Sequence, residues 1–263
     1  MEKKILIVGN WKMHLNTQQA SVLAHRLHET IQKRRDVEVV IAPSMLTLQP
    51  LSHEIDRRRF RLCAQNAHPQ DEGAFTGEVS FAMLGELAHY CLVGHSARRL
   101  YFGETDDFIR DKVAAAVRNE IVPIICVGET RIEREAGESR KVLSNQITTA
   151  LMNVTSSDLE NVVIAYEPVW AISTFDGILA KPEDVEEAIT FIRKQIASLY
   201  GARSAAKVRI LYGGSVNEHD AANYLRVDGV DGVLVGAASI NYKQFSKIAE
   251  VAYGISIEKA SKK

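Results

Sequence analysis

The most constraining feature of this 263-residue chain is a short apolar run that recurs eight times. The runs are KILIVGNWK (4–12), VEVVIAPS (37–44), RLCAQNAH (61–68), HYCLVGHS (89–96), VPIICVGE (122–129), NVVIAYEP (161–168), VRILYGGS (208–215) and DGVLVGAAS (231–239). Most of them are continuously apolar rather than alternating, which is typical of strands buried on both faces of a parallel sheet.

Helical patterns separate most of these runs. The long amphipathic stretches are 17–34, 106–119, 139–152 and 182–200, and shorter ones lie near 81–88, 218–226 and 242–251. The 182–200 helix has the clearest ends, because Pro182 suits a first helical position, two acids follow it and Gly201 suits a stop.

Eight strand–helix units in a chain of about 250 residues predict an α/β fold, namely a closed (β/α)8 barrel. The alternative is an open, doubly wound sheet. That fold needs no eighth unit and usually has a glycine-rich turn after its first strand, whereas the first run here ends in GNWK. No linker divides the chain, so we expect a single domain over 1–263, with a loose lysine-rich tail at 257–263.

Composition and charge argue against several kinds of partner. The formal net charge is −1, and the charged fraction of 25% is ordinary for a soluble globular protein. We therefore expect neither nucleic acid nor membrane as a partner, although a few local groups could hold a small anion. The three cysteines lack metal-ligand spacing, so no disulfide and no metal site are expected. The N-terminal apolar run is too short for a signal peptide, which predicts a cytoplasmic protein.

Polar side chains follow several of the predicted strands. Asn10 and Lys12 follow the first, His95 follows the fourth and Glu167 follows the sixth. In a barrel of this kind the carboxyl ends of the strands form the catalytic face. Taken singly, Asn10 could be a helix cap, Lys12 a solvated loop charge and His95 a core histidine. Glu167 is harder to explain in that way, because a carboxylate after an apolar run is costly unless it is paired or used.

Glycine-containing turns follow the last two strands, at Gly213-Gly214-Ser215 and at Gly236-Ala237. Glycine lets backbone N–H groups approach a phosphate closely, and barrels often bind phosphate at these two loops. The turns favour a phosphate-bearing ligand, with simple chain reversal as the alternative.

Motifs along the whole chain resemble the triosephosphate isomerase family. They are GNWKM (9–13), AQNAH (64–68), GAFTGEVS (73–80), VGHS (93–96), FGET (102–105), CVGE (126–129), YEPVWAI (166–172), YGGSV (212–216) and DGVLVG (231–236). The resemblance implies a TIM barrel that interconverts dihydroxyacetone phosphate and D-glyceraldehyde 3-phosphate through an enediolate. It implies an enzyme of glycolysis and gluconeogenesis with neither cofactor nor metal.

The resemblance also implies roles for individual residues. Glu167 would be the base that moves a proton between two substrate carbons, and His95 would polarise the carbonyl and relay protons. Lys12 and Asn10 would stabilise the oxyanion and help to hold the substrate. A helix beginning near Ser96 would disfavour a protonated His95 ring, so a neutral imidazole is expected. The remaining substrate-binding residues would be Ser173, Ser215, Gly236 and Ala237.

By the same resemblance the segment after Glu167 is a lid that closes over the phosphate. Its implied hinge is Pro168, Val169 and Trp170, its apolar pair against the base is Ile172 and Leu234, and its latch is Tyr212 with Ser215. Thr76 would enter the partner of a homodimer near the partner subunit's Lys12. Arg98 and Glu104 would form a structural ion pair under the site.

Three features depart from the family pattern. Ala97 stands where the family has a glutamate, which removes an acidic neighbour of Lys12. The lid tip, STFDGILA at 173–180, is longer than the family's Gly-Thr-Gly-Lys and has Asp176 in place of a lysine. Ala237 replaces a glycine, which is free of strain only if its φ is negative.

Two other functions stay open. A barrel that has lost turnover would serve as a phosphate-binding or scaffold protein, which Ala97 and the lid tip favour. The joint presence of Asn10, Lys12, His95 and Glu167 opposes it. Another phosphosugar isomerase or lyase would usually need a Schiff-base lysine inside a strand or a metal cluster, and the sequence predicts neither.

Overall fold

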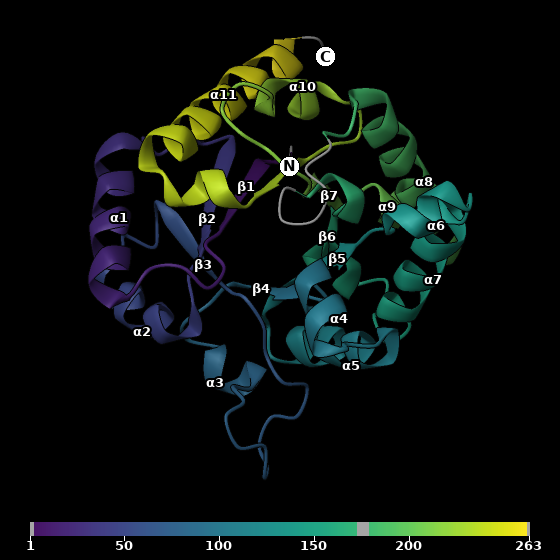
Figure 1. Ribbon diagram of the computed structural model, residues 1–263, viewed down its shortest axis with the longest axis horizontal. Helices are drawn as coiled ribbons and strands as arrows, with labels where there is room; N and C mark the ends of the chain where they lie inside the picture. Colours follow the sequence, from purple (N-terminus) through teal and green to yellow (C-terminus); the bar gives the residue numbers. More distant parts are fainter. Residues whose placement is uncertain (1–2, 173–178, 262–263) are drawn as a thin grey trace.

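The computed structural model describes residues 3–172 and 179–261, in which eight parallel strands close into a barrel (Figure 1). In barrel order, which is also chain order, they are β1 (Ile5–Asn10), β2 (Val37–Ala42), β3 (Phe60–Ala64), β4 (Tyr90–Val93), β5 (Val122–Val127), β6 (Val163–Tyr166), β7 (Arg209–Tyr212) and β8 (Gly232–Val235). The first and last strands pair directly, with Leu6 opposite Gly232. The predicted (β/α)8 barrel is confirmed.

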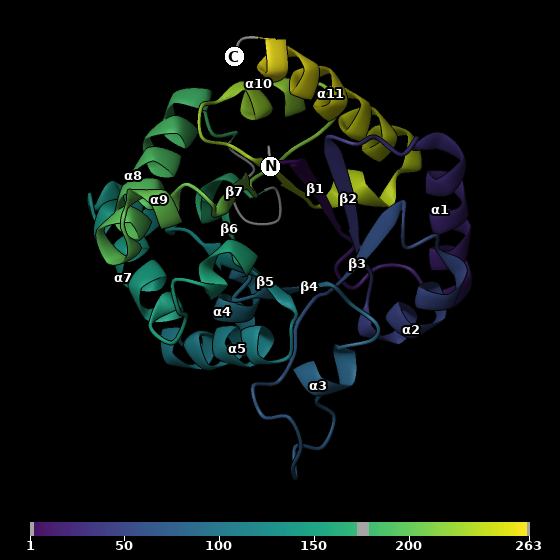
Figure 2. The ribbon, with the colours of Figure 1, turned by 180° about the vertical axis from the view of Figure 1, so that it is seen from behind.

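Helices surround the barrel on its outside, as both ribbon views show (Figures 1 and 2). They are α1 (Thr17–Thr30), α2 (Met45–Glu54), α3 (Phe81–Leu84), α4 (Ser96–Phe102), α5 (Asp106–Arg118), α6 (Arg131–Glu135), α7 (Ser139–Leu151), α8 (Pro182–Tyr200), α9 (Ala202–Ala205), α10 (Ala221–Arg226) and α11 (Tyr242–Ser261). Short 3-10 turns lie at η1 (Asp158–Asn161), η2 (Val169–Ala171) and η3 (Ala237–Ile240). None of the described helices combines the length and apolar character needed to span a bilayer.

The strands carry two apolar layers, which explains why their sequences are continuously apolar. On β1, Leu6 and Val8 belong to the cluster inside the barrel, whereas Ile5 and Ile7 belong to the cluster that packs the barrel against its helices. Successive side chains of a strand point to opposite faces, so a strand covered on both faces has no polar positions to spare. Polar groups are therefore displaced to the strand ends.

Several helix ends differ from the sequence prediction, and the contacts of the structure explain two of them. The helix α1 ends at Thr30 rather than at residue 34, because Ile31 adopts an extended conformation (φ −91°, ψ 115°) and is buried. The prediction of a loose tail from Ile257 is wrong as far as Ser261, because α11 continues to that residue. Its last turns are held by an ion pair of 3.0 Å between Arg226 and Glu258 and by a hydrogen bond from Lys259 Nζ to the Val230 carbonyl.

Candidate active site

The carboxylate of Glu167 faces the imidazole of His95 at the carboxyl end of the barrel. Its Oε1 lies 3.2 Å from His95 Nε2, and its Oε2 accepts a hydrogen bond of 3.1 Å from the Ser96 backbone N–H. The backbone N–H of Glu167 donates to the Val127 carbonyl, which continues the β5–β6 pairing by one residue. Glu167 is only 2% exposed, so water is almost excluded from this carboxylate.

His95 is oriented from its other ring nitrogen. It is the N-cap of α4, and its Nδ1 accepts a hydrogen bond of 3.1 Å from the Ala97 backbone N–H. A nitrogen that accepts carries no proton, which assigns a neutral ring its proton at Nε2, the atom that faces Glu167. The expected helix start at Ser96 is confirmed, so the ring of His95 lies at the N-terminus of α4.

Lys12 occupies an unusual backbone conformation. Its φ is 53°, in the left-handed region that residues with a side chain rarely adopt. The Lys12 N–H donates to Asn10 Oδ1 at 3.0 Å, and Gln65 Nε2 donates to the Lys12 carbonyl at 2.9 Å. Non-glycine residues in such conformations persist where the surroundings hold them, and they cluster at functional sites.

One cavity of about 290 Å³ joins these groups. Of the residues singled out in the sequence, those that line it are Asn10, Lys12, His95, Glu167, Ile172, Gly213, Gly214, Ser215, Leu234, Gly236 and Ala237. The structure does not bring Pro168, Val169, Trp170 and Tyr212 into the lining of this cavity, and Thr76 is exposed in the segment between β3 and α3 that extends away from the barrel (Figure 1). Ser173 and the lid-tip residues up to Ile178 lie outside the described residues.

The two glycine turns have different local reasons for their composition. A Cβ on Gly213 would lie 2.8 Å from Glu167 Cγ, so this glycine makes room for the carboxylate side chain. A Cβ on Gly236 would lie 3.8 Å from Lys12 Nζ, which places that turn beside the ammonium. Ala237, which follows Gly236, is absent from the positive-φ residues of the described chain, so its methyl group causes no backbone strain.

Ser215 offers a hydroxyl rather than its backbone N–H to the cavity. Its N–H donates to the Ala171 carbonyl at 3.1 Å, whereas its buried Oγ has no hydrogen-bond partner among the described residues. An unpartnered buried hydroxyl is unusual in a folded protein. It is therefore available to a ligand or to the neighbouring segment.

Glu129 fixes the start of the segment that follows β6, and the sequence analysis missed this role. Its fully buried carboxylate accepts hydrogen bonds from the Tyr166 hydroxyl at 3.1 Å and from Trp170 Nε1 at 2.9 Å. Its carbonyl also accepts from the Val169 N–H. The available signal was that the fifth apolar run, like the sixth, ends close to an acid. Ser96 and Gln65 were likewise not assigned a role.

Tyr212, the last residue of β7, connects that strand through Tyr224 to Ala180, at the far end of the segment that follows β6. Its ring stacks on Tyr224 at 4.2 Å, and the Tyr224 hydroxyl donates to the Ala180 carbonyl at 2.9 Å. Burial raises the pKa of Tyr212, so the phenol is neutral.

Behind the site, the predicted ion pair of Arg98 and Glu104 is present. Glu104 also pairs with the buried Lys112, whose Nζ donates to Asn66 Oδ1 at 2.7 Å. Burial lowers the pKa of Lys112, because a charged ammonium loses its hydration in the core. This network links α4 to α5, and none of its residues lines the cavity.

Comparison with known proteins decides the family. A family-level sequence model described as triosephosphate isomerase matches residues 5–252. The chain belongs to the triosephosphate isomerase family. It is 42% identical over 249 residues to the triosephosphate isomerase of Carboxydothermus hydrogenoformans, an alignment that covers 94% of this chain and 98% of that protein. The triosephosphate isomerases of Thermoanaerobacter pseudethanolicus (41%) and Citrifermentans bemidjiense (42%) match over 247 residues, with the same 94% and 98% coverage.

Proposed function

We propose that this chain interconverts dihydroxyacetone phosphate and D-glyceraldehyde 3-phosphate, in glycolysis and gluconeogenesis, with neither cofactor nor metal. The relatives reported above carry the name of that enzyme. The observation that carries the proposal is the 3.2 Å contact between Glu167 Oε1 and His95 Nε2 at the wall of a cavity that Lys12 and two glycine turns also line.

In this proposal Glu167 takes a proton from the substrate carbon next to the carbonyl and returns it to the neighbouring carbon. Its near-complete burial supports the role, because a site that excludes water protects the proton in transfer and the enediolate from side reactions. Both of its oxygens face His95 and Ser96 in the structure. The substrate therefore has to draw the side chain from the Ser96 N–H toward the cavity.

His95 and Lys12 stabilise the enediolate that forms between the two proton transfers. The neutral His95 ring donates from Nε2 to the substrate oxygen, while the Ala97 N–H holds Nδ1 in place. Lys12 supplies positive charge to the oxyanion and the phosphate, and Asn10 supplies a hydrogen bond. This division of roles is the established one for the family rather than a consequence of the geometry alone. Preorganised donors of this kind contribute about 10²–10³ each in rate.

The remaining assignments concern the phosphate and the lid. We assign the phosphate to Ser173, Ser215, Gly236 and Ala237, and the hinge to Pro168, Val169 and Trp170. Ile172 and Leu234 are 7% and 3% exposed and line the cavity, which supports their role as apolar contacts of the base. Tyr212 and Ser215 serve as the latch, supported by the link through Tyr224 to Ala180 and by the unpartnered Ser215 hydroxyl.

We also propose a single-domain cytoplasmic enzyme that works as a homodimer, with Thr76 reaching the partner. Large apolar side chains are exposed after four adjacent strands, and they are Met13, Leu46, Phe75, Met83, Leu100, Tyr101 and Phe102. Several large apolar side chains exposed on neighbouring connections at one end of the barrel support a protein–protein contact there. The three cysteines are free and buried, which suits a reducing compartment.

A coupled assay of the purified protein tests the proposal. The wild type should turn over both triose phosphates, and Glu167→Gln should reduce kcat by at least about 10³-fold because it removes the base. Equal activity of the two proteins would refute the assignment. The alternative of a phosphate-binding scaffold without turnover is not favoured by the family relationship, and it predicts no activity in the wild type.

A further inference from the structure

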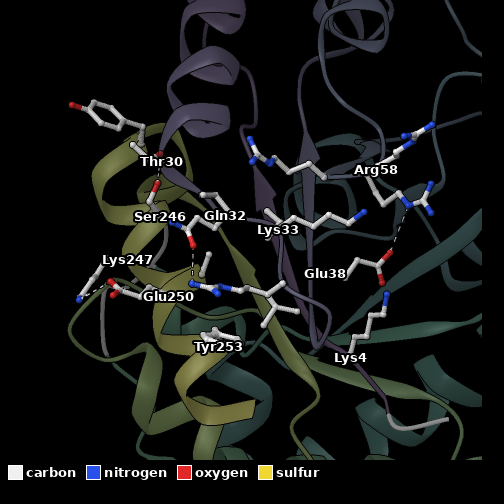
Figure 3. Close-up of a pocket in the computed structure, with 18 of the residues that line it drawn as sticks. Lys4, Thr30, Gln32, Lys33, Glu38, Arg58, Ser246, Lys247, Glu250 and Tyr253 are labelled. Carbon is white, nitrogen blue, oxygen red and sulfur yellow. Dashed lines mark hydrogen bonds and ion pairs between the residues drawn. The ribbon is translucent and has the colours of Figure 1, made fainter. Parts of the chain in front are cut away.

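A second and larger cavity lies at the opposite end of the barrel from the candidate active site. Its volume is about 520 Å³, compared with about 290 Å³ for the active-site cavity, and the two share no lining residue. Its wall comes from the segments that precede β1, β2 and β3, together with the first half of α11 (Figure 3). We call it the amino-end cleft.

The amino-end cleft concentrates positive charge. Nine lysines and arginines line it, against two glutamates, so its formal charge is +7. The whole chain carries 32 basic and 33 acidic residues with a net charge of −1, which leaves −8 for the rest of the molecule. The cations come from separate parts of the sequence, and six of them are Lys4, Lys33, Arg34, Arg58, Arg59 and Lys247.

The two carboxylates of the cleft are already engaged. Glu38 pairs with Arg209 at 2.9 Å and accepts from the Tyr90 hydroxyl, neither of which lines the cleft, and it pairs more weakly, at 4.0 Å, with Arg61, which does line it. Glu250 pairs with Lys247 at 2.8 Å. Among the described residues no carboxylate forms an ion pair with Lys33 or Arg58, and Figure 3 shows Lys33 extending across the cavity toward Arg58. Most of the positive charge is therefore not compensated locally.

Several of the guanidinium groups are fixed in place by groups that leave their charge intact. Arg57 donates to the carbonyls of Glu86 and Leu87 at 2.7 and 2.8 Å, and Arg59 donates to the His28 carbonyl at 2.7 Å. Arg34 lies over the Tyr253 ring at 4.3 Å. Carbonyl and ring contacts orient a cation without neutralising it, which reduces the entropy lost when an anion binds.

We propose that the amino-end cleft binds a polyphosphate anion with at least two linked phosphoryl groups, either free or at the end of a nucleotide. Arginine recognises phosphate oxygens in a bidentate manner, and the cations are too many and too widely spread for one phosphate. The negative balance of the remaining surface disfavours a long polyanion such as RNA, which would extend beyond the cleft. None of the exposed apolar residues of the proposed dimer contact lines the cleft, so it stays open in the dimer.

Calorimetric titration of the intact enzyme tests the proposal at 0.15 M salt with inorganic triphosphate, ATP, AMP and orthophosphate. Triphosphate and ATP should bind at least tenfold more tightly than AMP and orthophosphate, and their affinity should fall with rising salt. Equal affinities for triphosphate and ATP would show that a free polyphosphate chain is sufficient for binding. Tighter binding of ATP than of triphosphate would show that the site also recognises the nucleoside part of a nucleotide. Absence of binding, equal affinity for orthophosphate, or tighter binding of a single-stranded RNA would overturn the proposal.

Variants locate the site. The double variant Lys33→Gln/Arg58→Gln should weaken triphosphate binding at least tenfold and leave isomerase kcat/KM unchanged, because neither residue is near the active-site cavity. The matched control Arg140→Gln/Lys207→Gln removes the same two charge types from exposed positions outside the cleft, and it should retain wild-type binding. Equal weakening in both pairs would indicate general charge attraction and contradict a site. Unchanged triphosphate affinity in Lys33→Gln/Arg58→Gln would also contradict the proposed site, since triphosphate would then be bound elsewhere.

Discussion

At the scale of single residues, Gly213 is placed to control the position of the Glu167 carboxylate, the proposed base. Its φ is not positive, so an alanine would fit the backbone, but the new Cβ would meet Glu167 Cγ at 2.8 Å. We expect Gly213→Ala to push the carboxylate aside and to lower kcat by about 10²-fold, the effect of a misplacement near 1 Å. Gly254→Ala is the control, because open space surrounds that position and activity should not change. Wild-type kcat in Gly213→Ala would contradict the proposed crowding.

Ala97 tests how much a single missing carboxylate matters. It is half-buried, and its N–H already holds His95 Nδ1, so a longer side chain changes the surroundings without removing that hydrogen bond. We expect Ala97→Glu to raise turnover or substrate affinity a few-fold, because a nearby opposite charge holds the Lys12 ammonium in place. Ala97→Gln controls for size. If steady-state kinetics of Ala97→Glu equal those of the wild type, the missing acid does not limit this enzyme.

The buried thiol of Cys91 gives a signed pH prediction. Burial raises its pKa from 9.0 to about 12, so between these values the folded state keeps a proton that the unfolded state loses. The free energy of unfolding should therefore fall as pH rises above 9, by up to about 1.4 kcal/mol per pH unit from this group. Urea unfolding at pH 8 and 10 should show a smaller decline for Cys91→Ala than for the wild type. Parallel declines would show that Cys91 does not contribute.

At the scale of elements, we expect the proposed hinge after β6 to depend on the hydrogen bond from Trp170 to Glu129. Trp170→Phe removes one donor from a buried carboxylate, which should lower the free energy of unfolding by about 1–3 kcal/mol. It should also lower kcat if this turn guides the lid. Trp11→Phe is a matched control, because the buried Trp11 Nε1 has no hydrogen-bond partner among the described residues. Equal destabilisation by both substitutions, measured by urea unfolding, would contradict a specific role for Trp170.

The elements also show which features could be predicted from the sequence. The continuous apolar runs predicted the barrel because both faces of each strand are covered, and that information is local. The hydrogen bond from the Ser96 N–H to Glu167 joins residues that are 71 positions apart in the sequence. The hydrogen bond from Trp170 to Glu129 joins residues that are 41 positions apart. Contacts of this kind depend on the assembled barrel, so no spacing in the sequence predicts them. The residues Asn10, Lys12, His95 and Glu167 were found because they stand at strand ends.

At the scale of the whole molecule, the large apolar side chains exposed after β1 to β4, which we call the apolar face, would couple assembly to the active site in the proposed homodimer. Met13 is 94% exposed and directly follows Lys12, while Leu46, Met83 and Tyr101 are exposed after the next three strands. A monomer would leave this face in water and the strained Lys12 backbone without the partner's support. We therefore expect assembly and activity to be lost together.

The double variant Leu46→Asp/Tyr101→Asp tests this coupling, because two buried charges in a subunit contact are costly. Sedimentation should show a dimer for the wild type and a monomer for the variant, with kcat reduced at least about tenfold although neither residue lines the cavity. The control Ile132→Asp changes another apolar residue, 80% exposed and outside the apolar face, and it should stay dimeric and active. A monomeric variant with full activity would separate assembly from catalysis, and a monomeric wild type would refute the proposed contact.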